Sequence, residues 1–432
     1  MQSVLFGVHS KGLPKYLKRG QAIVKSYGMT PAKMAQALDQ FSQILGEFEC
    51  EATFPITAIA AKRNSKMMTE HIARGIEFAI HGYRHIDHAQ LALEEQLVHL
   101  RRAQDVFASA GIPVAGFRAP YLRFNQASDG AARVAGLEYV SNQPILWDAL
   151  QDVLLSPAAQ AVYERAIVLY NPWRASERFS LPQLCDQLVQ IPVSLPDDEM
   201  LLDRLDGDAH GLVEQAWSYM LSETHQRQEL LTLQLHPERI SRCAPPLRAL
   251  LAKARSLDPP VWITRLDKLA SWWRARSQAT VTVNSANHGE WRLNLAGPEG
   301  LTALVRNGNV QGAVHPWLDG YQSSEARHLV VKTLLRPFIG VSTNTPPEWV
   351  GFLREQGYLV EISDHSQDYS IYLNRPDPLP ENRYTILAQI EQSDKPLVKL
   401  GRWPNRAGSA LSITGDIDGL TIWDYVLRLF GH

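Results

Sequence analysis

The stretch Glu77-Phe-Ala-Ile-His81-Gly-Tyr-Arg-His85 joins an apolar run to two histidines four residues apart. The run ending at Ile80 predicts a buried strand. If the segment after His81 turns helically, both imidazoles lie on one face, one turn apart. Such a pair binds a borderline metal such as zinc when a third ligand and an open position are present. The chain has 14 histidines, so this spacing also arises by chance, and surface or core histidines are the alternative interpretation.

Strand-like and helix-like segments alternate on both sides of this stretch, from about residue 29 to residue 275. The predicted helices cover 29–45, 65–74, 89–110 and 129–135. The predicted strands cover 51–57, 76–80, 114–117, 137–141, 188–194 and 230–235. Repeated β–α units of this kind predict an α/β fold with parallel strands surrounded by helices, as an open sheet or a barrel.

The pattern changes from about Gln278, where strands of alternating polarity are separated by Gly, Asn and Pro turns. With one helix over 347–356, residues 278–400 predict an accessory α+β module. From Arg402 the chain predicts a short strand that ends in Asp416-Ile-Asp418-Gly419, followed by a helix over 420–430. Acids at the carboxyl end of a buried strand are where α/β proteins build their sites.

Composition and charge exclude several functional classes. The net charge of −2 gives no general attraction to nucleic acid or to an anionic membrane. We find no apolar run of the roughly 18 residues that a membrane span needs and no secretion signal, so we expect a cytoplasmic protein. The three cysteines, Cys50, Cys185 and Cys243, are widely spaced, which fits a reducing compartment. The sequence says nothing about the oligomeric state.

Three further signals follow predicted strands, as His81 does. They are Phe117-Arg118-Ala-Pro120-Tyr121, the histidine of Leu233-Gln-Leu-His236, and the pair Asp416 and Asp418. In a closed barrel, all of them would converge on one rim. Taken singly, each has an ordinary interpretation: a salt-bridged loop at Arg118, a helix start at His236, and a turn or helix cap at the two acids.

Together these motifs resemble the polysaccharide deacetylases, which are carbohydrate esterase family four with the NodB-like fold. The family carries an Asp-Asp or Asp-x-Asp motif, then H-x-x-x-H, R-x-P-aromatic and a late L-x-H. The histidine pair matches the second motif, and Arg118, Pro120 and Tyr121 match the third. His236 is a loose match to the fourth, because Gln234 stands where a strict motif has Leu. The resemblance covers residues 29–275 and implies a distorted (β/α) barrel.

One departure concerns the first motif, which should precede the helix at Met29. The stretch Ala22-Ile-Val-Lys-Ser-Tyr27-Gly28 holds no acid. Either the motif is lost and the protein is a silent relative, or the acids come from elsewhere. The C-terminal stretch from Trp403 to Gly419 resembles the opening of a family member. We therefore expect a circular permutation, in which 1–277 forms most of the barrel, 278–400 is the accessory module and 401–432 completes the barrel.

The resemblance and the chemistry of amide hydrolysis imply a role for each residue. Asp418, His81 and His85 would bind a divalent metal, zinc by preference, with Co, Mn or Ni as alternatives. Asp416 would be the general base, oriented by Arg118, and His236 the general acid. The backbone N–H of Tyr121 would serve the oxyanion, and Trp147 with Pro120 would line the substrate groove. A nearby carboxylate should stabilise His236, and the candidates for it are Asp148, Asp197 and Asp198.

The sequence thus predicts a metal-dependent hydrolase that removes an N-acetyl or similar acyl group from an amino sugar or glycan precursor. A deformylase or another C–N amide hydrolase on the same fold is one alternative. A catalytically silent, carbohydrate-binding relative is the other.

Overall fold

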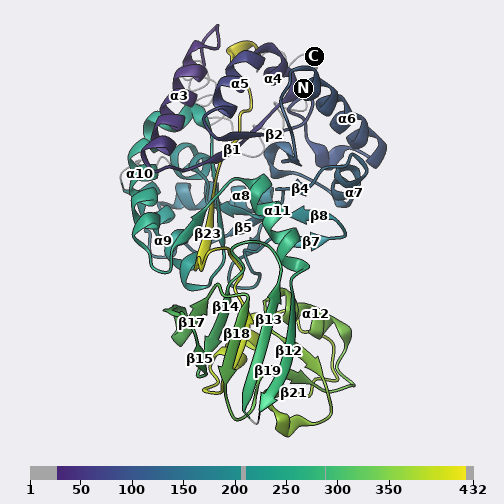
Figure 1. Ribbon diagram of the computed structural model, residues 1–432. Coiled ribbons are helices and arrows are strands. Elements are labelled where there is room, and N and C mark those ends of the chain that lie inside the picture. The colour runs from purple at the N-terminus through teal and green to yellow at the C-terminus, as the bar shows by residue number, and fades with distance from the viewer. Residues whose placement is uncertain (1–26, 206–210, 288, 425–432) are drawn as a thin grey trace.

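The computed structural model describes residues 27–205, 211–287 and 289–424. Its larger part is a mixed α/β unit built on a curled, half-barrel sheet, with helices around it (Figure 1). The smaller part, β12 to β22, lies below the barrel in that view. The predicted α/β barrel class is confirmed. Most of the predicted C-terminal helix, and residues 22–26 of the stretch before Met29, fall outside the described residues.

The barrel sheet runs in the order β6-β5-β9-β10-β23-β1-β2-β3-β4-β8-β7, and β11 also pairs with β23. Its main strands are β1 (Ala52–Ile56), β2 (Ile76–Ile80), β10 (Leu230–Leu235) and β23 (Ser409–Gly415). The shorter strands are β3 (Gly116–Phe117), β4 (Tyr139–Val140), β5 (Pro144–Leu146), β6 (Trp173–Arg174), β7 (Gln183–Cys185), β8 (Leu188–Gln190), β9 (Val193–Leu195) and β11 (Val261–Ile263).

The four main strands are buried along their whole length, as expected for parallel strands covered on both faces. The last of them, β23, pairs in parallel with β10 from Leu230↔Ala410 to Leu235↔Gly415. It also pairs in parallel with β1 through Thr53↔Thr414. A strand from the far end of the sequence therefore lies in the middle of the sheet, next to the strand that follows the first described helix.

The helices of this part are α3 (Ala32–Glu47), α4 (Ala58–Arg63), α5 (Ser65–Ile72), α6 (Leu93–Ser109), α7 (Gln126–Val134), α8 (Pro157–Tyr170), α9 (Leu212–Gln226), α10 (Ile240–Ser256) and α11 (Leu266–Ser277). The apolar face of α3 buries Leu38, Phe41 and Leu45 against the barrel core. No helix in the described part of the chain is both long and apolar enough to cross a bilayer.

Several predicted elements need correction. The predicted strand over 188–194 is two strands: β8 pairs with β4, whereas β9 pairs with β5 and β10. The helix predicted over 89–110 begins only at Leu93, after a short 3-10 turn over His88–Gln90. Helices α4, α8, α9, α10 and α11 have no counterpart among the predicted helices.

The smaller part contains three further sheets. Their strands are β12 (Thr280–Asn287), β13 (Glu290–Ala296), β14 (Ala303–Arg306), β15 (Asn309–Gln311), β16 (His315–Pro316), β17 (Tyr321–Ser324), β18 (His328–Lys332), β19 (Arg336–Val341), β20 (Val360–Ile362), β21 (Tyr369–Leu373) and β22 (Leu397–Leu400). Beside the predicted helix, α12 (Pro347–Glu355), it contains α13 (Tyr384–Glu391), which the turn-rich sequence before it had concealed.

Candidate active site

Each candidate cluster follows the carboxyl end of a strand in the barrel sheet. His81 follows β2, Arg118 follows β3, His236 follows β10 and Asp416 follows β23. These strands are parallel, so their carboxyl ends meet at one edge of the curled sheet. The convergence expected from the sequence is therefore present.

The two histidines and the second C-terminal acid form a buried group. The Nε2 atom of His85 lies 2.9 Å from Oδ1 of Asp418, and Nε2 of His81 lies 3.5 Å from the same oxygen. The two rings lie 5.0 Å apart between centroids. Their side chains and that of Asp418 are at most 9% exposed.

The segment after His81 is a bend and not a helical turn, which corrects the local geometry expected from the spacing. The bend depends on Gly82, whose φ is +81°. A Cβ at this position would lie 2.7 Å from the carbonyl oxygen of Arg84. This tight bend brings both imidazoles to one acid without a helix between them.

The orientation of the His81 ring is fixed by a backbone carbonyl on the side away from Asp418. Its Nδ1 lies 2.9 Å from the carbonyl oxygen of Arg118. A carbonyl only accepts, so Nδ1 is the donor in this contact, and Nε2 is the ring nitrogen that faces Asp418. An imidazole held in this way is the arrangement that metal-binding histidines commonly have.

Asp416, the first C-terminal acid, is held by a buried arginine. Nη1 of Arg118 donates to Oδ1 of Asp416 at 2.8 Å and to the hydroxyl of Thr414 at 2.7 Å. The same guanidinium donates to the carbonyl oxygen and the hydroxyl of Ser141 at 3.1 and 2.8 Å. Arg118 is 0% exposed, and Asp416 is the acid that pairs with its buried charge.

The other oxygen of Asp416 is bound by Gln234. The side-chain amide of Gln234 donates to Oδ2 at 3.1 Å. This glutamine is the residue that makes the late histidine motif a loose match, and no sequence pattern accounted for it. Its position, two residues before His236, places it on the inward face of β10 beside β23.

The loop after Arg118 carries Pro120 and Tyr121 past the histidines. Oδ1 of Asn142 accepts the N–H of Ala119 at 2.8 Å, which anchors the loop to the end of β4. Tyr121 has a φ of 61°, a left-handed conformation that is uncommon for an aromatic residue. Its ring packs edge-on against that of His85, with centroids 4.3 Å apart. Strain of this kind is characteristic of functional loops.

On the opposite side of β23, His236 pairs with an acid from the end of β9. Both oxygens of Asp198 lie at 2.7 Å, one from Nδ1 of His236 and the other from its backbone N–H. Burial alone lowers the pKa of this imidazole, but the charge of Asp198 outweighs it and raises the pKa of His236 to about 9. The imidazole is therefore protonated near neutral pH.

The three acids considered for His236 have different positions. Asp198 is the hydrogen-bond partner, and Asp197 is its buried neighbour. Asp148 is 47% exposed and faces Arg174 at 3.9 Å. Trp147 is only 1% exposed and packs in the barrel core, so it offers no open face on which a sugar could stack.

Sequence reasoning missed four polar residues of this site: Thr414, Ser141, Asn142 and Gln234. Three of them stand at or just after the ends of β4 and β23, which is the signal that could have found them. Each of the four acts through a partner from a distant part of the chain, which the sequence around it does not reveal.

Comparison with known proteins finds a similarity over the first barrel segment. Residues 25–140 match the family model described as polysaccharide deacetylase. That range contains the histidine pair and the loop from Arg118 to Tyr121. No curated protein matches the chain.

Several solved structures are similar to part of this chain. A provisionally named polysaccharide deacetylase from Mycobacterium smegmatis has a TM-score of 0.43 at 20% identity, over 58% of this chain and 81% of its own. The Puue allantoinase has a TM-score of 0.42 at 18% identity, over 55% and 72%. BA3943, a CE4 family pseudoenzyme from Bacillus anthracis, has a TM-score of 0.25 at 15% identity, over 42% and 57%.

The family match covers the histidine pair and the arginine loop, and the geometry shows both beside the C-terminal acids. Residues 25–140 of this chain are therefore similar to a polysaccharide deacetylase domain, and the site's histidine pair and arginine loop lie within that match.

Proposed function

We propose that this protein is a metal-dependent amidohydrolase that removes an N-acetyl or similar acyl group from an amino sugar or glycan precursor. The observation that carries the proposal is the buried cluster formed by the side chains of His81, His85 and Asp418. An acid held by an arginine lies on one side of this group, and a protonated histidine lies at the end of the neighbouring strand. This set contains each group that amide hydrolysis needs.

The spacing of the three donors fits a divalent ion such as zinc. Ligand atoms in a tetrahedral zinc site lie about 3.4 Å apart, because Zn–N and Zn–O bonds are about 2.0–2.1 Å long. The two separations from Oδ1 of Asp418, 2.9 and 3.5 Å, bracket that value. Co, Mn and Ni would accept the same donors. A divalent ion bound here supplies Lewis-acid polarisation of the amide carbonyl and of the attacking water.

Asp416 is suited to be the general base. Hydrogen bonds from Arg118 and Gln234 fix its two oxygens, so the carboxylate is oriented before a substrate arrives. It takes the proton of the attacking water. We assign the oxyanion contact to the backbone N–H of Tyr121, by resemblance to the family.

His236 is suited to be the general acid. Asp198 holds Nδ1, so the opposite ring nitrogen, Nε2, is the one that can give its proton to the leaving amine. With a pKa of about 9, the imidazolium is fully populated at neutral pH and is still acidic enough to protonate an amine as the C–N bond breaks.

The first experiment combines metal analysis with product detection. Purified protein is assayed for bound metal and for acetate or formate release from N-acetylated and N-formylated chito-oligosaccharides. We expect Asp418→Ala and His81→Ala to lose the metal, while His328→Ala, an exposed histidine in β18, retains it. Acetate release supports the deacetylase, and formate release alone supports the deformylase.

A second variant separates binding from chemistry. Asp416→Asn should retain the metal and lose at least about a hundredfold in kcat, the usual loss for a general base. Near-wild-type turnover in this variant would contradict the base assignment. A wild-type protein that binds no metal and releases no product would favour the silent, carbohydrate-binding alternative.

We also propose that the chain is a circularly permuted family member. The support is topological: β23 occupies a central place between β10 and β1, although it is the last described strand. Its acids supply what the stretch before Met29 lacks.

A further inference from the structure

A second group of possible metal ligands lies at the carboxyl ends of β9 and β10. It consists of Asp197, Asp198 and His236, whose ligand atoms all lie within 4.8 Å of one another. The two acids are 1% and 0% exposed, and the side chain of His236 is 12% exposed. The proposed acid pair accounts for only two of these three residues.

Asp197 is the residue of this group that has no role in the proposed hydrolysis. Its Oδ1 accepts the N–H of Met200 at 2.8 Å. Its Oδ2 is buried and has no hydrogen-bond partner among the described residues. Burial, and then the adjacent charge of Asp198, raise the pKa of Asp197. A buried carboxylate oxygen without a donor is costly, and a cation or a proton relieves that cost.

We propose that Asp197, Asp198 and His236 form a second, weaker divalent-cation site whose occupation inhibits the enzyme. The inference rests on the proposed function only for its inhibitory effect. Two carboxylates and one imidazole suit zinc, and the ligand atoms are Oδ2 of Asp197, an oxygen of Asp198 and Nδ1 of His236.

Binding must release a proton. The hydrogen between Nδ1 of His236 and Oδ1 of Asp198 leaves to solvent, because Nδ1 then gives its lone pair to the ion. A proton on Asp197 leaves as well where it is present. Apparent affinity should therefore rise about tenfold per pH unit for each proton released.

The inhibitory effect follows from the protonation state of the His236 imidazole. An imidazolium gives up its Nε2 proton readily and becomes neutral. An imidazole coordinated through Nδ1 is already neutral as a ligand, so losing its Nε2 proton would make it an imidazolate. It therefore holds that proton much more tightly. His236 coordinated in this way cannot protonate a leaving amine at neutral pH.

Neighbouring charges do not prevent a cation from binding. The charged and titratable groups that face the cluster are Arg204, Glu238, Arg239 and Cys243. Each arginine has its own acidic partner: Arg204 pairs with Glu199 at 2.7 Å, and Arg239 pairs with Asp203 and Glu238, both at 2.7 Å. Their charges are locally neutralised, which leaves the two cluster carboxylates to attract the ion.

The test is zinc binding to the full-length protein by equilibrium dialysis with metal analysis, at pH 6.5 and pH 8. We expect two zinc ions per wild-type chain at pH 8, the second at least tenfold weaker and weaker again at pH 6.5. Asp197→Asn should keep the first ion and lose the second, whereas Asp148→Asn, a control at an exposed aspartate, should bind both. Asp418→Ala should lose the tight ion and keep the weak one.

Excess zinc should reduce kcat in the wild type and in Asp148→Asn, and leave that of Asp197→Asn unchanged. Circular dichroism melts of the metal-free variants show whether each is folded. A wild type that binds a single ion, or an Asp197→Asn variant that still binds two, overturns the inference. Two ions with these variant effects but no hydrolysis would refute the proposed function and leave the second site standing.

Discussion

At the scale of single residues, the proposed base depends on a glutamine that the family pattern does not contain. Gln234 donates to Oδ2 of Asp416, and Arg118 binds only the other oxygen. Gln234→Leu restores the family residue but leaves that oxygen unbound. A buried acceptor without its donor costs about 1–3 kcal/mol. We therefore expect kcat to fall about ten- to a hundredfold, with little change in KM or in metal content.

The matched control is Gln190→Leu, because Gln190 also donates to a carboxylate, at 2.5 Å to Asp129, outside the site. Its kcat should stay within about twofold of the wild type. Equal losses in the two variants would show that the effect of Gln234 is one of general stability and not of base positioning.

The acid pair allows a prediction of pH dependence. His236 must be protonated to act as an acid, so activity should fall as pH rises through its pKa of about 9. Asp198→Asn removes the charge that raises this pKa, while burial, which lowers it, remains. The alkaline limb of kcat/KM should therefore move by at least one unit toward lower pH. A profile that keeps its alkaline limb in place would contradict the role of His236.

At the scale of elements, the sequence predicted the long, buried strands well. The bounds of β2 and β10 match the predicted ones because an uninterrupted apolar run is a local signal. The segment 188–194 was misjudged because the change of partner from β4 to β5 and β10 is decided by pairing with distant strands. The same contrast holds for the site. The residues that directly follow a strand were predicted, because that position is a local signal. The roles of Ser141 and Gln234 come only from contacts with distant residues.

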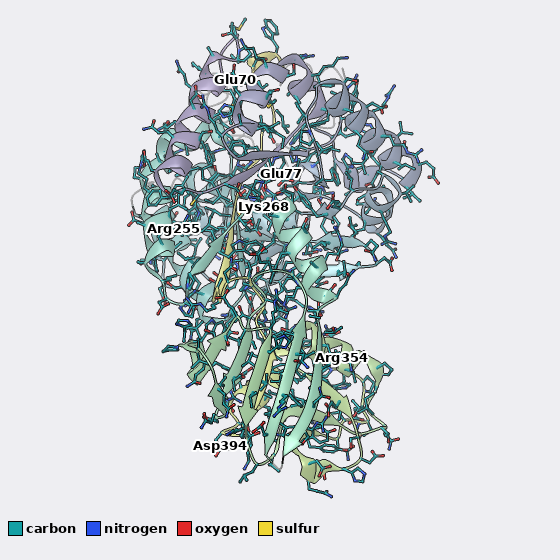
Figure 2. The ribbon with its side chains drawn as sticks, viewed as in Figure 1. Glu70, Glu77, Arg255, Lys268, Arg354 and Asp394 are labelled. Atoms are coloured by element: carbon teal, nitrogen blue, oxygen red, sulfur yellow. The ribbon has the colours of Figure 1, made fainter. Side chains whose placement is uncertain are left out.

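The prediction at this scale concerns a buried acid, Glu77, which joins three other elements at the end of the strands opposite the site. Glu77 of β2 accepts hydrogen bonds from Thr53 of β1 at 2.6 Å, Tyr139 of β4 at 2.8 Å and the N–H of Asp267 in α11 at 3.1 Å. Figure 2 shows it inside the barrel part, near Lys268 of α11. Burial, and then the charge of Asp267, raise the pKa of Glu77 to about 8.

Because the folded-state pKa exceeds the ordinary value of 4.5, folding favours neutral Glu77. Its contribution to stability is complete below about pH 4.5 and is lost as pH rises through 8. The free energy of unfolding should fall by roughly 2–3 kcal/mol between pH 5 and pH 7 from this group alone. Glu77→Gln has the same shape and no charge, so it should remove this decline.

Urea unfolding of both proteins at several pH values measures the effect. The exposed Glu94 provides the control, and Glu94→Gln should follow the wild-type curve. A Glu77→Gln protein less stable than the wild type at pH 7 would show that the three donors need a carboxylate.

At the scale of the whole molecule, the smaller part is tied to the barrel by specific contacts. The hydroxyl of Tyr384 in α13 donates to Glu229 at 2.8 Å, and Arg402 donates to Gln356 at 2.5 Å. Trp403, where the chain re-enters the barrel, packs against Trp273 with ring centroids 5.5 Å apart. The path from β22 into β23 is therefore held on both sides, which positions the C-terminal acids.

The proposed permutation makes a prediction about chain order. The backbone N–H of Ile422 donates to the carbonyl oxygen of Gly28 at 3.1 Å, and Arg63 binds Asp424 at 2.8 Å. The two ends of the described chain therefore lie side by side, as a permuted fold requires. A rearranged chain would start at Arg406, run to His432, continue through a short Gly/Ser linker to Met1 and end at Asn405. Asn405 is exposed and lies in a turn, where a new break should be tolerated.

This rearranged chain has β23 first, followed by α3 and the histidine pair, which is the order expected for the family. We expect it to fold, to melt within a few degrees of the wild type and to bind the same amount of zinc, because every strand keeps its neighbours. A control chain broken between Leu233 and Gln234, inside the central strand β10, should not fold. Failure of the Asn405 break alone would not be decisive, so a second break at the exposed Asn307, next to β14, is made in parallel. If the Asn307 chain folds and the Asn405 chain does not, β23 needs its covalent link to the smaller part, and the permutation proposal loses its structural basis.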